Sequence, residues 1–241
     1  MIDHAFGPVE GWPDQDLIGF SSTLDVDITL AGYTSGLFPM PLHESGYQGM
    51  CWWSPLRRGI IRAGELAVRR SLRKTAKRYA TTIDTAFERV IAACADPRRP
   101  GGWIDEQITA VYTTLFEQGQ AHSVETWDAA GRLVGGLYGV ALGGLFAGES
   151  MFHDPRHGRD ASKVALVRLM SELVGDGTRS PLLDVQWLTP HLASMGATEI
   201  SRERYLEMLG DALDAPDLDW PREVDTRRRG YGHWPPEAHD A

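Results

Sequence analysis

Hydrophobic residues recur every three or four positions in several stretches of the chain, which is the spacing of one face of an α-helix. The clearest stretch is 105–118, where two acidic residues in the first turn precede the periodic apolar positions. A second amphipathic stretch, 161–174, follows a polar loop. The predicted helices are 69–79, 85–94, 105–118, 161–174, 190–195 and 202–213.

Strand-like runs of apolar residues lie between these helices. Three of them, 121–127, 133–141 and 144–152, are separated only by short turns rich in Gly, Ala or Asp. Such spacing predicts consecutive antiparallel strands. Shorter runs at 81–83 and 182–186 add two further strands. The pattern therefore predicts an α+β fold whose antiparallel or mixed sheet is flanked by helices, in the order found in the GNAT type of N-acetyltransferase.

The first 57 residues differ from the rest because they are rich in Gly, Pro and aromatic residues and lack a long periodic run. We expect a small irregular N-terminal domain over 1–57, a GNAT-like domain over 58–214, and a loosely attached C-terminal tail over 215–241. The GNAT-like domain is large enough to bury its own core without a partner, so we expect a monomer.

Composition and charge narrow the class of protein. The sequence has two cysteines, no run of 18 apolar residues and no basic-then-apolar start, so we expect a cytoplasmic protein without disulfides or membrane spans. Its net charge is −9, yet the segment 57–78 carries +8 and leaves −17 for the remainder. A local basic surface on an acidic body either binds a polyanion through phosphate contacts or is a solvated helix face.

Two side-chain groups that suggest chemistry are rejected on spacing. His153 and His157 are four residues apart, but Pro155 lies between them, so a loop is expected there and not a metal-binding helix. Ser123, with a histidine before it and Glu125 two residues later, forms no catalytic triad because neighbouring strand residues face opposite ways. We expect no metal and no cofactor.

A series of motifs in fixed order covers about residues 30–210. The motifs are Gly36-Leu-Phe-Pro39, Trp52-Trp-Ser-Pro55, Gly102-Trp-Ile-Asp105, Gly119-Gln-Ala-His-Ser-Val-Glu125, Leu133-Val-Gly-Gly-Leu-Tyr-Gly-Val-Ala141, Leu145-Phe-Ala-Gly-Glu-Ser-Met-Phe152, Ala161-Ser-Lys-Val-Ala-Leu166, Leu183-Asp-Val-Gln186 and His191-Leu-Ala-Ser-Met-Gly-Ala197. Together they are similar to the leucyl/phenylalanyl-tRNA-protein transferase family. Each motif alone is weak, but their number and order make the resemblance specific.

The resemblance implies an activity and its partners. The enzyme would move Leu or Phe, with Met as a further candidate, from a charged tRNA to proteins that begin with Arg or Lys. The transfer would mark those proteins for degradation by the N-end rule pathway. The ester of an aminoacyl-tRNA is already activated, so positioning can supply much of the rate and no cofactor is needed.

The resemblance also implies residues for binding the aminoacyl-adenosine end of the tRNA. The side-chain pocket would be formed by Leu137, Phe146, Gly148, Met151 and Leu183, although ordinary core packing also explains each apolar residue alone.

The adenosine would lie on Trp103, since an aromatic face stacks on any base. After Phe-Pro the family commonly has tryptophan, whereas this chain has Met40, which packs against adenine without stacking as flatly. Trp52 or Trp53 would then compensate.

Three polar residues are candidates for the chemistry. Asp184 and Gln186 lie two apart on a predicted strand and are therefore expected on one face. Gln186 would hydrogen-bond the attacking amine, Asp184 would orient the amide or take up proton density, and Glu149 would attract a basic acceptor. The predicted helix 69–79 would hold tRNA phosphates through its cations. These cations are Arg69, Arg70, Arg73, Lys74 and Lys77.

Two other functions compete with this interpretation. A CoA-dependent acyltransferase on the same fold needs a pyrophosphate loop of the form Gln/Arg-x-x-Gly-x-Gly/Ala, and the stretch 156–162 has a glycine in the wrong register. A non-catalytic module that binds tRNA or protein N-termini is favoured by Met40, whereas the polar residues Glu149, Asp184 and Gln186 argue against it.

Overall fold

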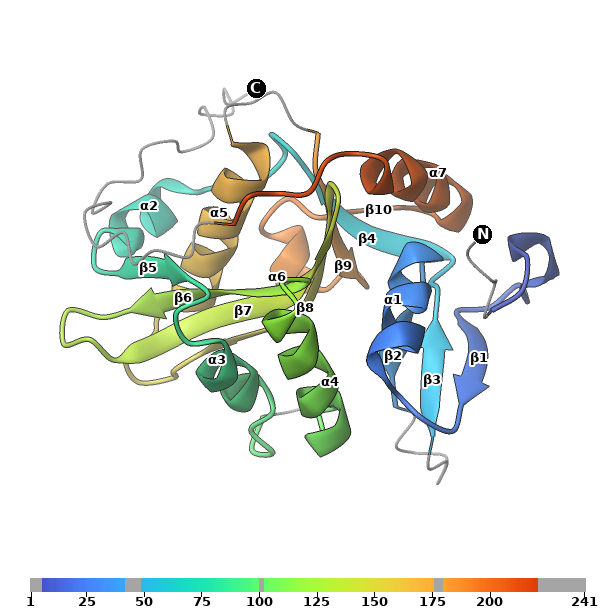
Figure 1. The fold of residues 1–241 in the computed structure, drawn as a ribbon. Helices are drawn as coiled ribbons and strands as arrows, with labels where there is room; N and C mark the ends of the chain where they lie inside the picture. Colours follow the sequence, from blue (N-terminus) through green and yellow to red (C-terminus); the bar gives the residue numbers. More distant parts are fainter. Residues whose placement is uncertain (1–5, 42–48, 100–101, 176–179, 221–241) are drawn as a thin grey trace.

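The computed structural model describes residues 6–41, 49–99, 102–175 and 180–220. These residues form two sheets (Figure 1). The smaller sheet has three antiparallel strands in the order β1-β3-β2 and is accompanied by one helix. Its elements are the 3-10 turn η1 (Val9–Gly11), β1 (Leu17–Ser21), α1 (Val26–Thr34), β2 (Phe38–Met40) and β3 (Met50–Trp53).

The larger sheet has seven strands in the order β10-β4-β9-β8-β7-β6-β5. Among the described strands only β8 and β9 are parallel, so the sheet is mixed and the α+β prediction is confirmed. Its strands are β4 (Arg57–Arg62), β5 (Ala80–Ile83), β6 (Ala121–Trp127), β7 (Leu133–Leu142), β8 (Leu145–His153), β9 (Leu182–Gln186) and β10 (Thr198–Ser201). The helices are α2 (Arg70–Ala76), α3 (Phe87–Cys94), α4 (Glu106–Glu117), α5 (Ala161–Val174), α6 (Pro190–Ala193) and α7 (Arg202–Leu213).

Two faces of the large sheet are covered by different helices. One hydrophobic cluster joins α2, α5 and α6 to one face, and the clusters of α3, α4 and α7 cover the other. Between β8 and β9 the chain crosses over through α5, which is how two parallel neighbouring strands are usually connected. The side chains of β9 alternate accordingly, because Leu183 packs with α5 and Leu182 packs with α7.

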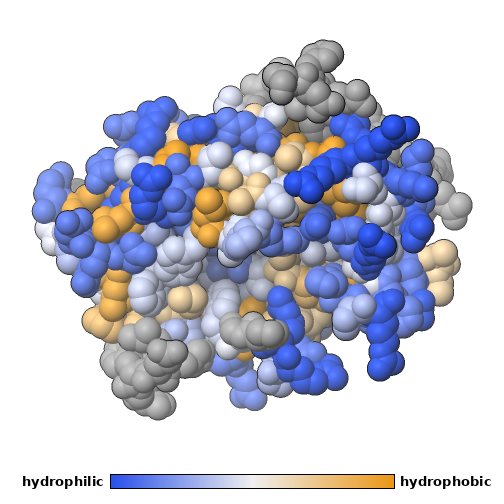
Figure 2. All heavy atoms as spheres, turned by 180° about the vertical axis from the view of Figure 1, so that it is seen from behind, coloured by the Kyte–Doolittle hydropathy of each residue, from blue (hydrophilic) through white to orange (hydrophobic). Residues whose placement is uncertain are grey.

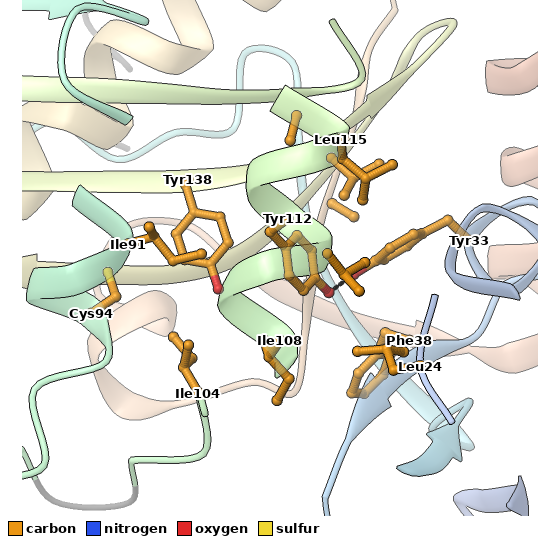
Figure 3. Packing of buried hydrophobic residues seen from close by; sticks show 14 of the residues in the cluster. Leu24, Tyr33, Phe38, Ile91, Cys94, Ile104, Ile108, Tyr112, Leu115 and Tyr138 are labelled. Carbon is orange, nitrogen blue, oxygen red and sulfur yellow. Dashed lines mark hydrogen bonds between the residues drawn. The ribbon is translucent and has the colours of Figure 1, made fainter. Parts of the chain in front are cut away.

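The two sheets share one core. Leu24, Tyr33 and Phe38 of the N-terminal part pack in the same cluster as Ile108 and Tyr112 of α4 (Figure 3). The N-terminal part is thus fixed against the large sheet by buried apolar area, with no separate core of its own among the described residues.

The structure corrects the sequence-based expectation in three places. The N-terminal part is not irregular, because it forms the sheet β1-β3-β2 and the helix α1. Asp25 caps α1 by accepting a 2.9 Å hydrogen bond from the amide of Ile28. Strands β4 and β10 were not predicted. The predicted helix 69–79 is shorter, since α2 covers only Arg70–Ala76.

The predicted C-terminal tail begins at 215, and its first six residues lie within the described part. Asp217 accepts a 2.8 Å hydrogen bond from the amide of Gly143, and the Trp220 ring stacks on His122 with centroids 4.2 Å apart. Residues 221–241 lie outside the described residues. No helix in the described chain is long and apolar enough to cross a membrane.

Candidate functional site

A mainly apolar pocket of about 230 Å³ lies where β8 and β9 separate, between α5, α6 and β2. Hydrogen-bonded pairing between β8 and β9 runs only from Leu145 opposite Leu182 to Ala147 opposite Asp184. Beyond that point each strand contributes residues to the pocket wall. The pocket is lined by Phe38, Pro39, Met40, Trp103, Leu137, Gly148, Glu149, Ser150, Met151, Leu166, Leu169, Leu183, Val185, Gln186, Trp187, Thr189 and Leu192.

Gly148 keeps part of this space open. A Cβ added there would be 3.6 Å from the carbonyl oxygen of Asp184 and 4.0 Å from Leu183, which is ordinary contact distance. A methyl group would therefore fit, whereas longer side chains would extend into the pocket. Because glycine has no side chain, the pocket extends to the backbone of β8 at Gly148.

Gln186 reaches the pocket because the backbone leaves the regular strand conformation there. Its φ is +57°, a left-handed value that costs a non-glycine residue about 1–3 kcal/mol. Opposite it lies Gly59, beside a register shift in β4. A Cβ on Gly59 would be 3.0 Å from the amide nitrogen of Leu188, so a glycine lets the chain after Gln186 approach closely. The Gln186 Nε2 atom is buried and has no hydrogen-bond partner among the described residues.

Asp184 does not share that orientation, contrary to the expectation from strand alternation. Its carboxylate is fully buried and accepts hydrogen bonds from Arg58 at 2.8 and 2.5 Å and from the Tyr205 hydroxyl at 2.9 Å. Oδ1 also accepts the backbone amide of Gln186 at 2.9 Å. Asp184 therefore faces α7, and its hydrogen bond to the amide of Gln186 connects it to the pocket wall.

Arg58 was counted from the sequence among the surface cations, yet its side chain is only 1% exposed. Besides Asp184, it donates to the carbonyl of Gly36 at 3.1 Å, and its guanidinium lies over the rings of Phe38 and Tyr205. The Arg58–Asp184 pair thus connects the N-terminal part, the sheet and α7.

Glu149 belongs to a second buried polar chain. Its Oε2 accepts a 3.0 Å hydrogen bond from the Tyr112 hydroxyl, which lies 2.5 Å from the hydroxyl of Tyr33 on α1. Figure 3 shows these two tyrosines pointing toward each other across the core. Burial raises the pKa of Glu149 to about 7, despite opposing hydrogen bonds from Tyr33 and Tyr112. Its other oxygen, Oε1, is buried and has no partner among the described residues.

The structure gathers most of the residues predicted for the aminoacyl-adenosine end around this pocket. Those that line it are Trp103, Met40, Leu137, Gly148, Met151 and Leu183, together with Glu149 and Gln186. Phe146 does not line it, because its side chain points into the core and is fully buried. Trp52 is also fully buried, so it offers no surface to a nucleoside.

Several pocket residues were missed. Leu166 and Leu169 are three apart on α5, and helical spacing alone marks them only as core. Trp187 directly follows Gln186 and packs edge-on against Trp53 and Phe38. The backbone turn that brings Trp187 to the pocket had no recognisable sequence signal.

The predicted phosphate-binding cations surround a shallow surface hollow at α2, which is lined by Arg70, Ser71, Arg73, Lys74 and Lys77. Arg69 precedes the helix as its N-cap and is exposed. Arg73 is half-buried, so its charge is less available than that of its neighbours. Figure 2 shows one face of the molecule as mostly hydrophilic, with hydrophobic side chains scattered among the polar ones.

The rejected constellations have structural roles. His122 bonds to Asp84 at 2.6 Å, while Ser123 donates to Glu125 at 2.5 Å from the opposite strand face. His157 lies in a loop and pairs with Asp154 at 3.3 Å. Among the described residues, no group of three or more His, Cys, Asp or Glu side chains could hold a metal ion.

Comparisons with known proteins agree on one family. Residues 60–210 match the family model described as leucyl/phenylalanyl-tRNA protein transferase, and residues 22–56 match the model of its N-terminal domain. The leucyl/phenylalanyl-tRNA–protein transferase of Afipia carboxidovorans is 45% identical over 200 residues, which cover 81% of this chain and 85% of that protein. The protein of the same name from Paramagnetospirillum magneticum is 47% identical over 194 residues, covering 79% and 90%.

Solved structures are more distant. The structure of L-PGS from Bacillus licheniformis aligns with a TM-score of 0.37 and 12% identity, covering 56% of this chain and 46% of that chain. That similarity is too low to carry an argument about the fold.

The family matches place the protein in the class of aminoacyltransferases. The chain belongs to the leucyl/phenylalanyl-tRNA protein transferase family.

Proposed function

We propose that this enzyme transfers Leu or Phe, with Met as a further candidate, from tRNA to the N-terminal amine of proteins that begin with Arg or Lys. One observation carries the proposal beyond family membership. Two buried polar atoms without partners, Glu149 Oε1 and Gln186 Nε2, belong to residues that line the same apolar pocket. Buried polar groups are ordinarily hydrogen-bonded, so these two are suited to bind a polar substrate.

The apolar part of the pocket would take the side chain of the aminoacyl group. A cavity of about 150 Å³ suffices for benzene, so about 230 Å³ accommodates a phenyl or isobutyl group. Leu137, Met151 and Leu183 provide apolar contacts without a shape that excludes either group. Because such walls discriminate only modestly between apolar groups, use of Leu, Phe and Met is expected.

The adenosine would bind at the side of the pocket formed by Trp103 and Met40. Both are half-buried and both line the pocket. Trp187 lies against Phe38, the residue two before Met40, and provides the second aromatic surface that Met40 does not. Stacking of the base on an aromatic ring contributes about 1–3 kcal/mol.

The reaction forms one C–N bond and breaks one C–O bond. The neutral α-amine attacks the ester carbonyl, and the ribose oxygen leaves with the proton that the amine gives up. Because Nε2 is a hydrogen-bond donor, Gln186 donates to the carbonyl oxygen as negative charge develops on it, and not to the attacking amine. Glu149 Oε1 accepts a hydrogen bond from the attacking amine, and as a carboxylate it attracts a basic first residue. Asp184 is a positioning residue, since it holds the backbone of Gln186 at 2.9 Å.

We also propose that the larger domain is GNAT-like, with domain limits of 1–57, 58–214 and 215–241. The parallel pair β8–β9 that separates at the pocket supports this proposal. We further propose that the protein is a cytoplasmic monomer without a cofactor, and that the transfer marks acceptor proteins for N-end rule degradation. Acidic Glu149 beside the pocket supports an acceptor with a basic first residue.

A transfer assay with labelled phenylalanyl-tRNA or leucyl-tRNA tests the proposed function. Each tRNA is offered one acceptor peptide that begins with Arg and a matched peptide that begins with Met. Transfer of label to the amino terminus of the Arg peptide alone is expected. If a folded protein that binds tRNA transfers neither amino acid, the proposed reaction is wrong. Transfer to both peptides alike would leave the reaction but remove the proposed acceptor specificity.

The Tyr112→Phe variant is expected to move the rising limb of the pH–rate profile to higher pH by about one unit. A hydroxyl that donates to a carboxylate stabilises its charged form, so loss of the donor raises the pKa of Glu149 above its value of about 7. The carboxylate form, which accepts from the amine, then appears only at higher pH. The measurement is kcat/KM between pH 5.5 and 9 with one acceptor peptide.

Tyr138→Phe is the matched control for this shift. Tyr138 is fully buried, and its hydroxyl has no hydrogen-bond partner among the described residues. The acceptor amine titrates identically in all variants, so only a difference between profiles reports on Glu149. Identical profiles for wild type and Tyr112→Phe would show that Glu149 does not act as the carboxylate.

A further inference from the structure

Basic residues are concentrated in the loop between β8 and α5, outside the pocket and outside α2. Arg156 and Arg159 are exposed in this loop, and Lys163 lies in the first turn of α5. The Arg156 side chain has no hydrogen bond or ion pair with any described residue. The two acids of the loop are already engaged. Asp160 pairs with Lys163 at 3.0 Å and with Arg159 at 3.8 Å, and Asp154 accepts the amides of Arg156 and His157 at 2.8 Å.

One end of this basic segment adjoins the pocket. Lys163 lies one helical turn before Leu166, which lines the pocket, and therefore shares its side of α5. On α6, His191 immediately precedes the pocket residue Leu192. Burial lowers the pKa of His191, and the charges of Lys163 and then His153 lower it further. These groups from three elements are therefore within electrostatic reach of one another beside the pocket.

The other end adjoins α2. The Tyr79 hydroxyl donates to the carbonyl oxygens of His157 at 3.1 Å and Arg159 at 3.0 Å, which fixes the loop against the segment that follows α2. Lys77 and Arg78 directly precede Tyr79 and are exposed. In Figure 1, α2 and α5 lie next to each other, and they pack together in one cluster.

The exposed cations of α2 and of the loop, followed by the half-buried Lys163, therefore form a series that runs from α2 to the pocket. We define the basic track as Lys77, Arg78, Arg156, Arg159 and Lys163. We propose that the basic track binds the backbone phosphates of the single-stranded 3′ end of the tRNA, between the pocket and the part of the tRNA at α2. The inference rests on the proposed function, because it requires that the aminoacylated end occupy the pocket.

Phosphate contacts of this kind position a nucleic acid without reading its bases. A single strand whose terminal nucleoside lies in the pocket has its next phosphates just outside, where the track begins. Cations there would fix the path of the strand and so direct the ester carbonyl toward Gln186. The inferred ligand is a phosphodiester backbone, not a free nucleotide.

The test is the double variant Arg156→Gln/Arg159→Gln, with two acyl donors. The first is phenylalanyl-tRNA and the second is a phosphate-free ester of phenylalanine with adenosine. For the tRNA, KM is expected to rise about tenfold, and the slope of log(kcat/KM) against log salt to fall by about 0.7 for each lost contact. For the nucleoside ester, and for the acceptor peptide, the kinetic constants should stay at wild-type values.

Arg204→Gln is the matched control, since Arg204 is exposed on α7 at the other end of the sheet from α2 (Figure 1). It should leave the KM for tRNA unchanged. An unchanged KM and salt slope in the double variant would overturn the track. An equal rise in KM for the nucleoside ester would also overturn the track, because the substitutions would then affect the pocket itself. A raised KM for the acceptor peptide alone would overturn it too, because the cations would then bind the acceptor.

Failure of the proposed function is distinguishable from failure of the track. If the wild type transfers from neither donor, the proposed reaction fails. Direct binding of phenylalanyl-tRNA at several salt concentrations then still tests the track. A weaker Kd and a smaller salt slope in the double variant would support it, and identical binding curves would overturn it. Thermal melting confirms that each variant is folded.

Discussion

Replacing Gln186 with alanine is expected to lower kcat/KM for the transfer by at least about 100-fold, with little change in the melting temperature. Removal of a hydrogen-bond donor aimed at a developing oxyanion typically costs about 10²–10³ in kcat. Gln186 Nε2 has no partner within the described protein, so its loss breaks no hydrogen bond there. The effect should therefore appear in the kinetics and not in stability.

Two further variants make this result specific. Gln186→Glu keeps the size of the side chain but replaces the donor with a charged acceptor, and it should be as inactive as the alanine variant. Gln120→Ala is the control, because the buried Gln120 Oε1 also lacks a partner among the described residues and Gln120 does not line the pocket. Near-normal kcat/KM in Gln186→Ala would remove Gln186 from the mechanism and leave the pocket as a binding site only.

The Arg58→Met variant is expected to lower the free energy of unfolding by about 3–5 kcal/mol, the largest stability effect we expect from one substitution. Arg58 and Asp184 are 1% and 0% exposed at the side chain, so removing the cation leaves a buried, uncompensated carboxylate. The loss also removes the bond from Arg58 to the Gly36 carbonyl and its contact with Phe38. Urea unfolding at pH 7 measures the change.

The neighbouring arginine provides a control in the same strand. Arg57 is 66% exposed and pairs with Glu199 at 3.4 Å, so Arg57→Met should cost at most about 1 kcal/mol. The double variant Arg58→Met/Asp184→Leu should recover most of the lost stability, since it removes both charges. Equal costs for Arg57→Met and Arg58→Met would show that the buried pair does not stabilise the fold.

Elements whose stability depends on nearby residues were well predicted from the sequence. Helix α4 begins where expected, because Asp105 caps it through a 2.8 Å bond from the amide of Ile108 and its apolar residues follow helical spacing. The hairpins joining β6, β7 and β8 were also confirmed, since short turns determine which strands become neighbours.

Strands β4 and β10, which pair with partners distant in the sequence or with each other across it, were missed. Strand β4 has the sequence Arg-Arg-Gly-Ile-Ile-Arg, which has no clear alternation, and its neighbours β9 and β10 come much later in the chain. A strand in this position forms because it is covered and paired on both edges. No local window of the sequence contains that information.

The candidate site divides in the same way. The ordered motifs identified the family and eight of the seventeen residues that line the pocket, because these lie in short segments with recognisable patterns. The roles of the charged residues were not available from those segments. Arg58 was grouped with surface cations, although the fold buries it against Asp184.

The sequence alone therefore determined the helices and strands with local signals, the family, and the apolar character of the pocket. Only the tertiary structure decided which polar groups remain without partners there. It turned Asp184 toward Arg58, left Gln186 Nε2 and Glu149 Oε1 unpaired among the described residues, and linked Glu149 through Tyr112 to Tyr33. The physical reason is that helix and turn preferences act over a few neighbouring residues, whereas desolvation and hydrogen bonding depend on which distant groups are buried together.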